Sequence, residues 1–190
     1  MKKKTIKTII SMITILFIFS SISYAATPTE WVNAHNKYRR MHLSPPVTWD
    51  NALAQKALNC ANIPKGQKPL SNGNHCNYGE NWSSSTGSAE SIVGSWYSEE
   101  ASYNTLVGYG NEPKTTIKNG MTVLDDPNFP KYGHFTQVVW KSTKKIGCAS
   151  GNYGTVCNYE PYGNYANQFA ANVKQKMPQV DMKVNGLDLD

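Results

Sequence analysis

The sequence lacks the short motifs that mark the common hydrolases and metal centres. It contains no HExxH, the helix motif of many zinc proteases, and no GxSxG, the nucleophile motif of many serine hydrolases. None of its four cysteines belongs to a CxxC pair, which argues against a zinc site built from four thiolates. These absences leave the usual protease, esterase and zinc-finger chemistries without support in the sequence.

Long apolar runs are also missing after the first 25 residues. Before that point, four lysines precede an apolar run from about Ile9 to Ile22, and Ser23 and Ala25 fit the −3 and −1 positions of a cleavage site. This pattern predicts a secretory signal peptide over residues 1–25. A membrane anchor is the alternative, but the run falls short of the roughly 20 residues that span a bilayer. We therefore expect a secreted protein, extracellular or periplasmic, that does not span a membrane.

The mature chain has little net charge. The formal net charge of the whole sequence is +6, and four of the positive charges are the lysines of the signal peptide, so the mature 165 residues carry +2. No basic stripe with interleaved aromatic residues accompanies this small excess. A nucleic-acid partner is therefore not expected. The mature length fits one domain.

The four cysteines are expected to form two disulfides, because an even number in an exported protein favours pairing. If the turn-like segment 151–154 closes a hairpin, Cys148 lies directly opposite Cys157. The Cα atoms of a non-hydrogen-bonded antiparallel pair lie roughly 4.5 Å apart, within disulfide range. Cys60–Cys76 then follows by elimination. It would close a loop of about 17 residues and contribute roughly 3 kcal/mol.

Two helices are predicted in the first part of the mature chain. The first begins with the capping-box sequence at 27–30, with a proline at its first position. The second is capped by Asp50. Apolar residues recur at helical spacing in both, namely Trp31, Ala34, Tyr38 and Met41 in the first and Leu53, Ala57, Cys60 and Ala61 in the second. Residues 62–79 are rich in Asn, Gly and Pro and are predicted to be loop.

A third helix is predicted from about Ser88 to Glu100. Its apolar face carries Ile92 and Trp96, and the next position on that face is Glu99. A carboxylate on a buried face needs a partner, because burying a lone charge is costly. Glu100 lies off that face and is expected to be solvated.

The later part of the chain is predicted to be mainly β. Residues 101–133 are interpreted as a long loop with one short helix. A strand is expected from His134, with His134, Thr136, Val138 and Trp140 on one face, and a hairpin over 146–159 follows. Residues 173–190 show no clear period and are expected to form a loosely ordered tail. Helices first and strands later indicate an α+β domain.

Several segments resemble the landmarks of one family. GHFTQVVWKSTKKIGCA (133–149) and CNYEPYGNY (157–165) resemble the two signatures of the CAP superfamily, which comprises cysteine-rich secretory, antigen five and pathogenesis-related class one proteins. Three further segments look like its other landmarks in the family's order, namely HNKYRR, WDNALAQKA and YGENW. The resemblance covers about residues 29–172. It implies a CAP domain there, folded as a three-layer α-β-α sandwich with a central antiparallel sheet and a cleft.

The resemblance also implies a site. Family members often carry two histidines and two acids in the cleft, and the matching residues here are His75, Glu80, Glu99 and His134. Imidazoles and carboxylates form a partial ligand set for Zn²⁺. Two alternatives stay open, namely a polar cluster whose members only satisfy each other, and a catalytic His/Glu pair. His35 and His42 do not match the cleft. We expect His35 to pack or cap locally and His42 to lie on the surface.

The resemblance favours binding over catalysis. Some relatives bind sterols or fatty acids, so a sterol, a fatty acid or an extracellular protein is the expected partner. An extracellular, protease-like hydrolase that uses the His/Glu cleft is the alternative. Candidate surface for an apolar pocket comes from the segment 101–130, although the same residues would equally pack on the core: Tyr103, Leu106, Val107, Tyr109, Met121, Val123, Leu124 and Phe129. The chain departs from the pattern at Tyr162, where many relatives have a second proline.

Overall fold

The computed structural model describes residues 25–64 and 79–178. Within these residues a four-stranded sheet has the order β1-β5-β6-β2. The strands are β1 (Thr48–Trp49), β2 (Glu80–Ser83), β5 (Lys145–Gly151) and β6 (Gly154–Glu160). β5, β6 and β2 are antiparallel neighbours, and the two-residue β1 pairs in parallel with the edge of β5. Residues 1–24 of the predicted signal peptide, the CAP-like histidine His75 and Cys76 all lie outside the described residues.

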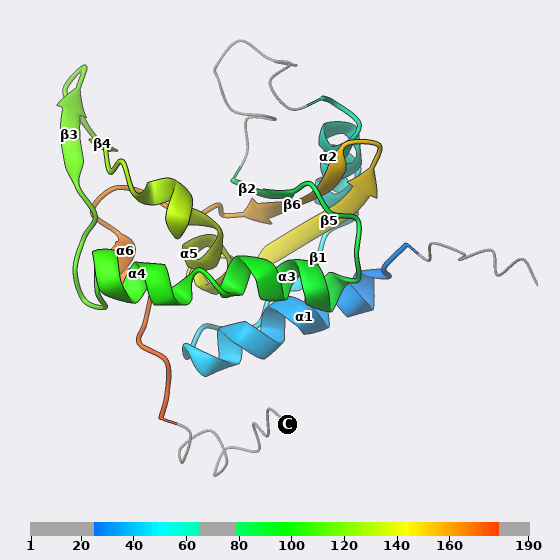
Figure 1. The fold of residues 1–190 in the computed structure, drawn as a ribbon, viewed down its shortest axis with the longest axis horizontal. Coiled ribbons are helices and arrows are strands. Elements are labelled where there is room, and N and C mark those ends of the chain that lie inside the picture. Colours follow the sequence, from blue (N-terminus) through cyan, green and yellow to red (C-terminus); the bar gives the residue numbers. More distant parts are fainter. Residues whose placement is uncertain (1–24, 65–78, 179–190) are drawn as a thin grey trace, which may run out of the picture.

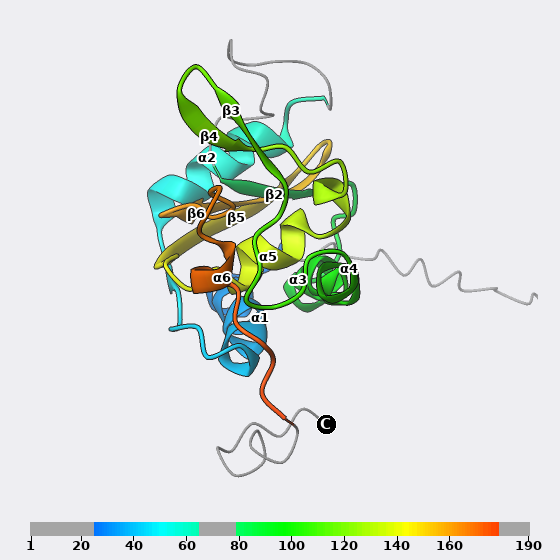
Figure 2. The ribbon, with the colours of Figure 1, turned by 90° about the vertical axis from the view of Figure 1, so that its left-hand side faces the viewer.

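Helices cover both faces of this sheet. α2 (Asn51–Ala61) lies against β5 and β6 on one face. On the other face α1 (Pro28–Met41), α3 (Ala89–Tyr97) and α5 (Gly133–Val139) pack against one another, and α1 reaches β5. Figures 1 and 2 show the sheet between these two layers. The predicted α-β-α sandwich is therefore confirmed.

The first two helices begin where the sequence predicts. The Thr27 hydroxyl oxygen accepts a hydrogen bond from the Glu30 N–H, and the Glu30 carboxylate accepts one from the Thr27 N–H, so the capping box is complete. The Asp50 carboxylate accepts from the N–H groups of Ala52 and Leu53 at the start of α2. The apolar residues predicted for α2 are all buried, and α1 buries Trp31, Ala34 and Met41.

α2 approaches the sheet unusually closely. A Cβ atom added to Gly147 of β5 would collide with the backbone of Leu53 and Ala54, and one added to Gly151 would crowd Ala61. Glycine at these two positions lets the helix backbone lie directly on the strand. The contact seals the face of the sheet opposite α1.

The third predicted helix is divided into two. Ser88 caps α3 as expected, but α3 ends at Tyr97 and α4 spans Glu100–Leu106. The Ser95 and Ser98 hydroxyls donate to the carbonyls of Ile92 and Ser95, each at 2.7 Å. Such side-chain bonds compete with the helical backbone pattern and weaken its continuation. Glu99, at the junction, is thereby free to turn toward α5.

The long loop predicted over 101–133 contains a hairpin in addition to α4. β3 (Thr115–Lys118) and β4 (Met121–Leu124) pair antiparallel, and the short helix η1 (Phe129–Lys131) follows. Asn119 and Gly120 have φ angles of 52° and 75°. Two positive φ values define the tight turn that Asn-Gly favours between strands. The loop prediction was therefore wrong here, and the Asn-Gly pair was the signal that would have corrected it.

The strand predicted from His134 is a helix, α5. All of its residues except His134 are buried. A segment buried on every side shows no reliable period, so its alternation of apolar and polar residues was misleading. The Glu99 carboxylate accepts from the N–H groups of His134 and Phe135 and so satisfies the start of α5 from a distant part of the chain.

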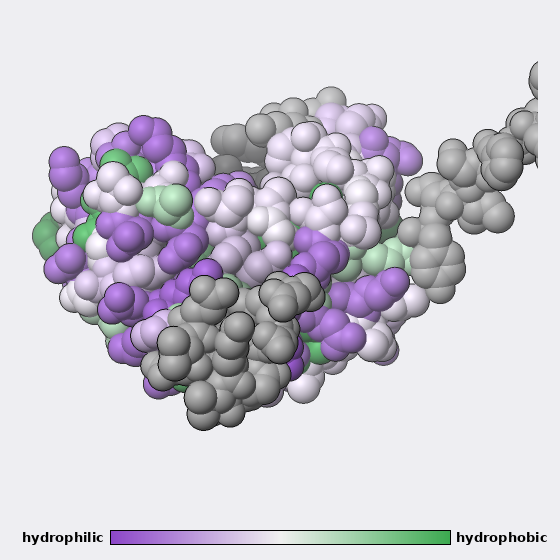
Figure 3. Space-filling view, turned by 60° about the horizontal axis from the view of Figure 1, so that its bottom comes forward, coloured by the Kyte–Doolittle hydropathy of each residue, from purple (hydrophilic) through white to green (hydrophobic). Residues whose placement is uncertain are grey.

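The packing of the domain continues past residue 172. Val173 is fully buried, and the Met177 N–H donates to the Met41 carbonyl at 2.9 Å. The first part of the predicted tail therefore lies along the end of α1, while residues 179–190 lie outside the described residues. Where this side of the molecule is not covered by grey atoms, its surface ranges from hydrophilic to neutral, with small separate hydrophobic patches (Figure 3). None of the described helices combines the length and apolarity needed to cross a membrane.

Candidate functional site

His134 and Glu99 form a direct pair. The His134 Nδ1 lies 2.7 Å from the Glu99 Oε1, and the Glu99 Oε2 accepts from the His134 N–H at 3.0 Å and the Phe135 N–H at 3.3 Å. A carboxylate is also favoured at a helix N-terminus by the helix dipole. Both oxygens of Glu99 are thus engaged, and the carboxylate fixes the orientation of the imidazole. The partner that the buried-face position of Glu99 required is His134.

His134 also lines a small pocket. The pocket has a volume of about 110 Å³ and is lined by Glu80, Asn81, Phe129, Pro130, Gly133, His134 and Asn164. The imidazole stacks on Trp96, with ring centroids 6.2 Å apart and planes at 21°. Burial of Glu80 raises the pKa of its carboxyl to about 7. Two groups of the predicted site, His134 and Glu80, therefore share one pocket wall.

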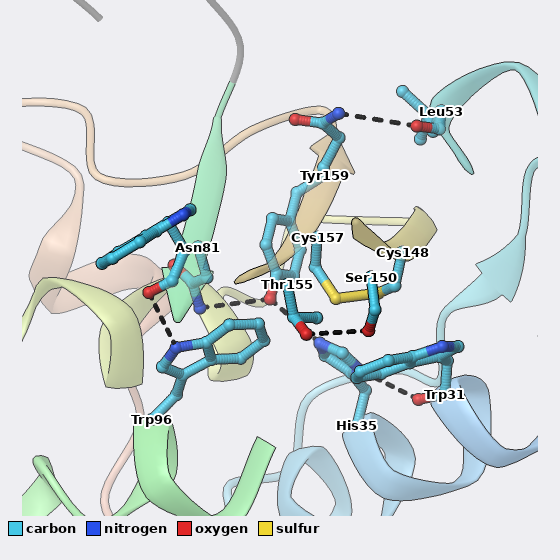
Figure 4. Close-up of a disulfide and its surroundings, with 12 residues drawn as sticks. Trp31, His35, Leu53, Asn81, Trp96, Cys148, Ser150, Thr155, Cys157 and Tyr159 are labelled. Atoms are coloured by element: carbon cyan, nitrogen blue, oxygen red, sulfur yellow. Dashed lines mark hydrogen bonds between the residues drawn. A yellow bond between two sulfur atoms is a disulfide. The ribbon is translucent and has the colours of Figure 1, made fainter. Parts of the chain in front are cut away.

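Asn81 ties this pocket to the interior. Its Nδ2 donates to the His134 carbonyl at 3.0 Å and to the Tyr159 hydroxyl at 3.1 Å. Tyr159 in turn contacts the His35 Nε2 at 2.9 Å, as Figure 4 shows. Sequence reasoning missed both Asn81 and Tyr159 as site residues. The available signal was their position inside the YGENW and CNYEPYGNY segments.

His35 lies at the inner end of this chain of bonds. Its Nδ1 lies 2.8 Å from the Trp31 carbonyl, so both ring nitrogens have protein partners. Burial lowers the pKa of His35 to about 4, which keeps the ring neutral at physiological pH. The expectation that His35 packs or caps locally describes its contact with Trp31, one turn earlier in α1, but not its contact with the distant Tyr159.

A second cluster of ligand-type atoms lies beside His35. The ring and the sulfurs of Cys148 and Cys157 lie within 4.8 Å of one another. Both sulfurs are joined in a disulfide, with Cα atoms 4.0 Å apart, and the ring nitrogens are hydrogen-bonded (Figure 4). This cluster is therefore closed to a metal ion in the oxidised protein.

The predicted disulfide and its register are confirmed. Cys148 pairs with Cys157 across β5 and β6, and Gly151 pairs with Gly154 at the turn. Cys60 is also disulfide-bonded, and no cysteine of the described part is free. Cys76, its predicted partner, lies outside the described residues.

The expectation that His42 lies on the surface was wrong. His42 is fully buried, with its Nδ1 at 2.6 Å from the Lys174 carbonyl and its Nε2 at 3.0 Å from the Tyr97 hydroxyl. The residue follows the last turn of α1, where the sequence alone indicates an exposed end. The segment 173–178, which is distant in sequence, covers that end.

The structure thus assembles part of the predicted site. His134 contacts Glu99 directly and shares a pocket with Glu80. In the described part of the chain these three do not form a compact group of three metal-ligating atoms. The fourth predicted member, His75, lies outside the described residues.

Comparison with known proteins identifies the family. A family model described as "Cysteine-rich secretory protein family" (CAP) matches residues 32–159, which include Glu80, Glu99 and His134. The chain belongs to the CAP family. The α-β-α sandwich and the motif order of the chain are therefore those of a CAP domain.

Curated CAP proteins resemble the chain over most of its length. Pathogenesis-related protein 1 of Arabidopsis thaliana is 38% identical over 146 residues, which cover 73% of this chain and 79% of the plant protein. Secreted protein PRY1 of Candida albicans is 33% identical over 156 residues, which cover 78% of this chain but 32% of the fungal protein. The matched segment is thus most of the plant relative and about a third of the fungal one.

Solved structures share the fold. BmVAL-1 superposes with a TM-score of 0.52 at 22% identity, covering 78% of this chain and 80% of that one. NaASP2, solved with Zn²⁺, gives a TM-score of 0.51 at 23% identity, covering 78% of this chain and 86% of that one. At this identity the likeness concerns the fold alone.

Proposed function

We propose that this CAP protein is exported, that its cleft binds a divalent metal ion such as Zn²⁺, and that it acts by binding a lipid or an extracellular protein rather than by catalysis. The observation that carries the metal proposal is the His134–Glu99 pair. A histidine that ligates a metal almost always donates its other ring N–H to a carboxylate or carbonyl, which fixes the tautomer. Glu99 is placed to do this for His134 at 2.7 Å.

The donor atoms of the cleft fit zinc. A neutral imidazole nitrogen and a carboxylate oxygen are ligands that Zn²⁺ accepts, and His134 and Glu80 supply them in one pocket. His75 is the second imidazole that the motif order predicts. Glu99 fits less well as a ligand, because both of its oxygens are engaged by α5. We therefore assign His134, His75 and Glu80 as ligands and Glu99 as the residue that orients His134. NaASP2, which shares the fold, was solved with Zn²⁺.

Fewer of the apolar residues in 101–130 are exposed for lipid binding than the sequence alone suggested. Of the apolar residues named in 101–130, Tyr103 belongs to the core, and Val107, Tyr109, Leu124 and Phe129 pack against it. Leu106 and Met121 remain exposed, as does Ile117 of the hairpin. Ile117 and Met121 belong to the β3–β4 hairpin, and the exposed apolar side chains there are the surface that we propose for a lipid chain or a protein contact. PRY1 and RBT4, both relatives from Candida albicans, are named secreted proteins, which supports export.

The hydrolase alternative gains nothing from the geometry. No serine, threonine or cysteine stands among the described residues that line the pocket. A nucleophile beside a base is the arrangement that covalent hydrolysis needs.

The metal proposal is tested by calorimetric titration with Zn²⁺ at pH 7.5. We expect the wild type to bind, His134→Ala and His75→Ala to abolish binding, and Glu80→Ala to weaken it. Glu160→Gln, which changes an exposed acid at the end of β6, is the matched control and should bind as the wild type does. His42→Ala is unsuitable as a control because His42 is buried. Binding no tighter than millimolar, or a His75→Ala variant equal to the wild type, would refute the metal site.

A further inference from the structure

Two pairs of stacked tyrosines have different surroundings. Tyr38 and Tyr97 stack at a centroid distance of 4.1 Å, and their hydroxyls contact Glu90 and His42. Both of these rings are partly buried against the core. Tyr162 and Tyr165 stack at 4.7 Å with planes at 26°, yet they remain 44% and 40% exposed. The second pair therefore keeps much of its ring surface open although each ring covers part of the other.

The open pair stands on a fixed piece of backbone. Between the two tyrosines, the Gly163 N–H donates to the Gln137 Oε1 at 2.8 Å. The Asn164 amide is held at both ends, because its Oδ1 accepts from Thr136 at 2.6 Å and its Nδ2 donates to the Gly133 carbonyl at 3.0 Å. These bonds anchor the loop to α5. Rings presented on a fixed loop lose little conformational entropy when a ligand binds.

The stretch of chain that carries the pair has no charged residue. No Asp, Glu, Lys or Arg occurs between Glu160 and Lys174 in the sequence. The exposed residues of this stretch are Pro161, Tyr162, Tyr165, Asn167, Gln168 and Ala171, so its exposed polar side chains are the two phenols and the amides of Asn167 and Gln168. The neighbouring Glu112 carboxylate is engaged by the N–H groups of Phe169 and Ala170. Flat aromatic faces beside neutral amides suit a ligand that is itself neutral, with apolar C–H faces and many hydroxyl groups.

We propose that Tyr162, Tyr165, Asn167 and Gln168 form a binding ledge for a neutral glycan, at the rim of the His134 pocket. A pyranose ring presents its axial C–H groups to an aromatic face, which carries partial negative charge. Its hydroxyls would bond to the phenols and amides around the rings. Asn164, which lies between the tyrosines, also lines the pocket, so the ledge adjoins the cleft. This site is separate from the metal site proposed above and needs no metal.

The test measures binding of two neutral probes, cellohexaose and chitohexaose, and of an anionic one, polygalacturonate, by calorimetry and by affinity electrophoresis. We expect the wild type to bind at least one probe, with an affinity that changes little between 50 mM and 500 mM NaCl, because a neutral ligand is not screened by salt. Tyr162→Ala and Tyr165→Ala should each weaken binding at least tenfold. Tyr165→Phe, which keeps the ring, should weaken it less.

Tyr153→Ala is the matched control. Tyr153 is also an exposed tyrosine, at 46%, but it stands alone in the turn between β5 and β6. Its loss should leave glycan binding unchanged. Melting temperatures and tyrosine ring resonances recorded on the wild type with cellohexaose provide a readout that does not depend on any variant folding.

Four results would overturn the ledge. They are no binding of either probe, an equal loss in Tyr153→Ala, binding only of anionic polygalacturonate with steep salt dependence, and loss of glycan binding in EDTA. Loss of glycan binding in EDTA would indicate that the glycan binds at the metal site and not at the tyrosines. Unchanged binding in EDTA together with a negative zinc titration would leave the ledge standing and refute only the metal proposal.

Discussion

His35 of α1 and His42 at the end of α1 are bonded differently from His134, the histidine of the pocket. His35 and His42 are fully buried, and both nitrogens of each ring have partners within the fold. His134 is partly exposed, and Glu99 holds one of its nitrogens while the ring lines a pocket. A ring whose two nitrogens are both satisfied is structural, whereas a ring with one oriented nitrogen and an open side is suited to a ligand.

Arg39 and Glu99 differ in a similar way: Arg39 bonds only to backbone carbonyls of the interior, whereas Glu99 orients the ring of His134 beside the pocket. Arg39 is fully buried without a carboxylate partner among its hydrogen bonds, and its guanidinium donates to the carbonyls of Pro45, Val138, Trp140 and Thr143. Burial lowers the pKa of Arg39 to about 10, which still leaves it charged at neutral pH. The charged group of Arg39 thus joins α1 to the end of α5, whereas the charged group of Glu99 orients the ring of His134. Four changes test this distinction.

The largest effect is expected from Arg39→Met. The change leaves four carbonyls without their buried donor, and losing one partner of a buried charged network costs about 3–5 kcal/mol. Urea unfolding followed by circular dichroism measures the loss. Arg40→Met, at the neighbouring exposed position, is the control and should cost less than about 0.5 kcal/mol. Equal losses in the two variants would show that the interior does not depend on Arg39.

The second effect concerns His35 and acid. Its folded pKa of about 4 lies below the ordinary value of 6.5, so the unfolded chain binds the proton first. Stability contributed by the neutral ring is present above pH 6.5 and is lost as the pH falls toward 4, by about 3 kcal/mol. Unfolding free energies at pH 7, 6, 5 and 4 should therefore fall less steeply for His35→Gln than for the wild type. Parallel curves would contradict the buried neutral ring, since both proteins share all other titrating groups.

The third effect concerns the disulfide that lies beside His35. The bond joins residues nine apart, and the chain-entropy relation gives about 2.5 kcal/mol for a loop of that size. The double change Cys148→Ser and Cys157→Ser should lower the free energy of unfolding by that amount. Ser150→Ala, which removes a 2.8 Å hydroxyl contact two residues further along the same strand, should cost about 1 kcal/mol. A double variant no less stable than Ser150→Ala would remove the disulfide as a support of the hairpin.

The smallest effect on stability, but a specific one on binding, is expected from Glu99→Gln. The amide keeps an oxygen for the N–H groups of α5 but loses the charge that holds His134. Residues in this orienting role typically change metal affinity by about 10–100-fold. Zinc titration should therefore show that loss in Glu99→Gln and none in Glu160→Gln. A complete loss, equal to that of His134→Ala, would instead make Glu99 a direct ligand.

Local patterns predicted the parts of the molecule that depend on neighbouring residues. The capping box at Thr27, the Asp50 cap and the apolar face of α2 all involve contacts within one turn, and each is confirmed. The register that places Cys148 opposite Cys157 follows from the length of one turn. Motif order was sufficient for the family, and the position of Glu99 on a buried face correctly required a partner.

The identity of α5 and the burial of His42 could not be obtained in this way. α5 is short and buried on nearly every side, so its sequence has no face that distinguishes helix from strand. Its first N–H groups are satisfied by Glu99, about 35 positions earlier in the chain. His42 is covered by a segment some 130 residues away. Neither contact can be predicted from the residues next to it in the sequence.

The sequence by itself determined the family, the caps of the first helices and the disulfide register, because these depend on short-range geometry or on motif order. Only the tertiary structure decided which histidines are structural, which acid orients His134 and which tyrosines remain open to solvent. Those properties depend on burial and on bonds between distant segments. The pKa and the availability of a side chain are set by what the fold places around it.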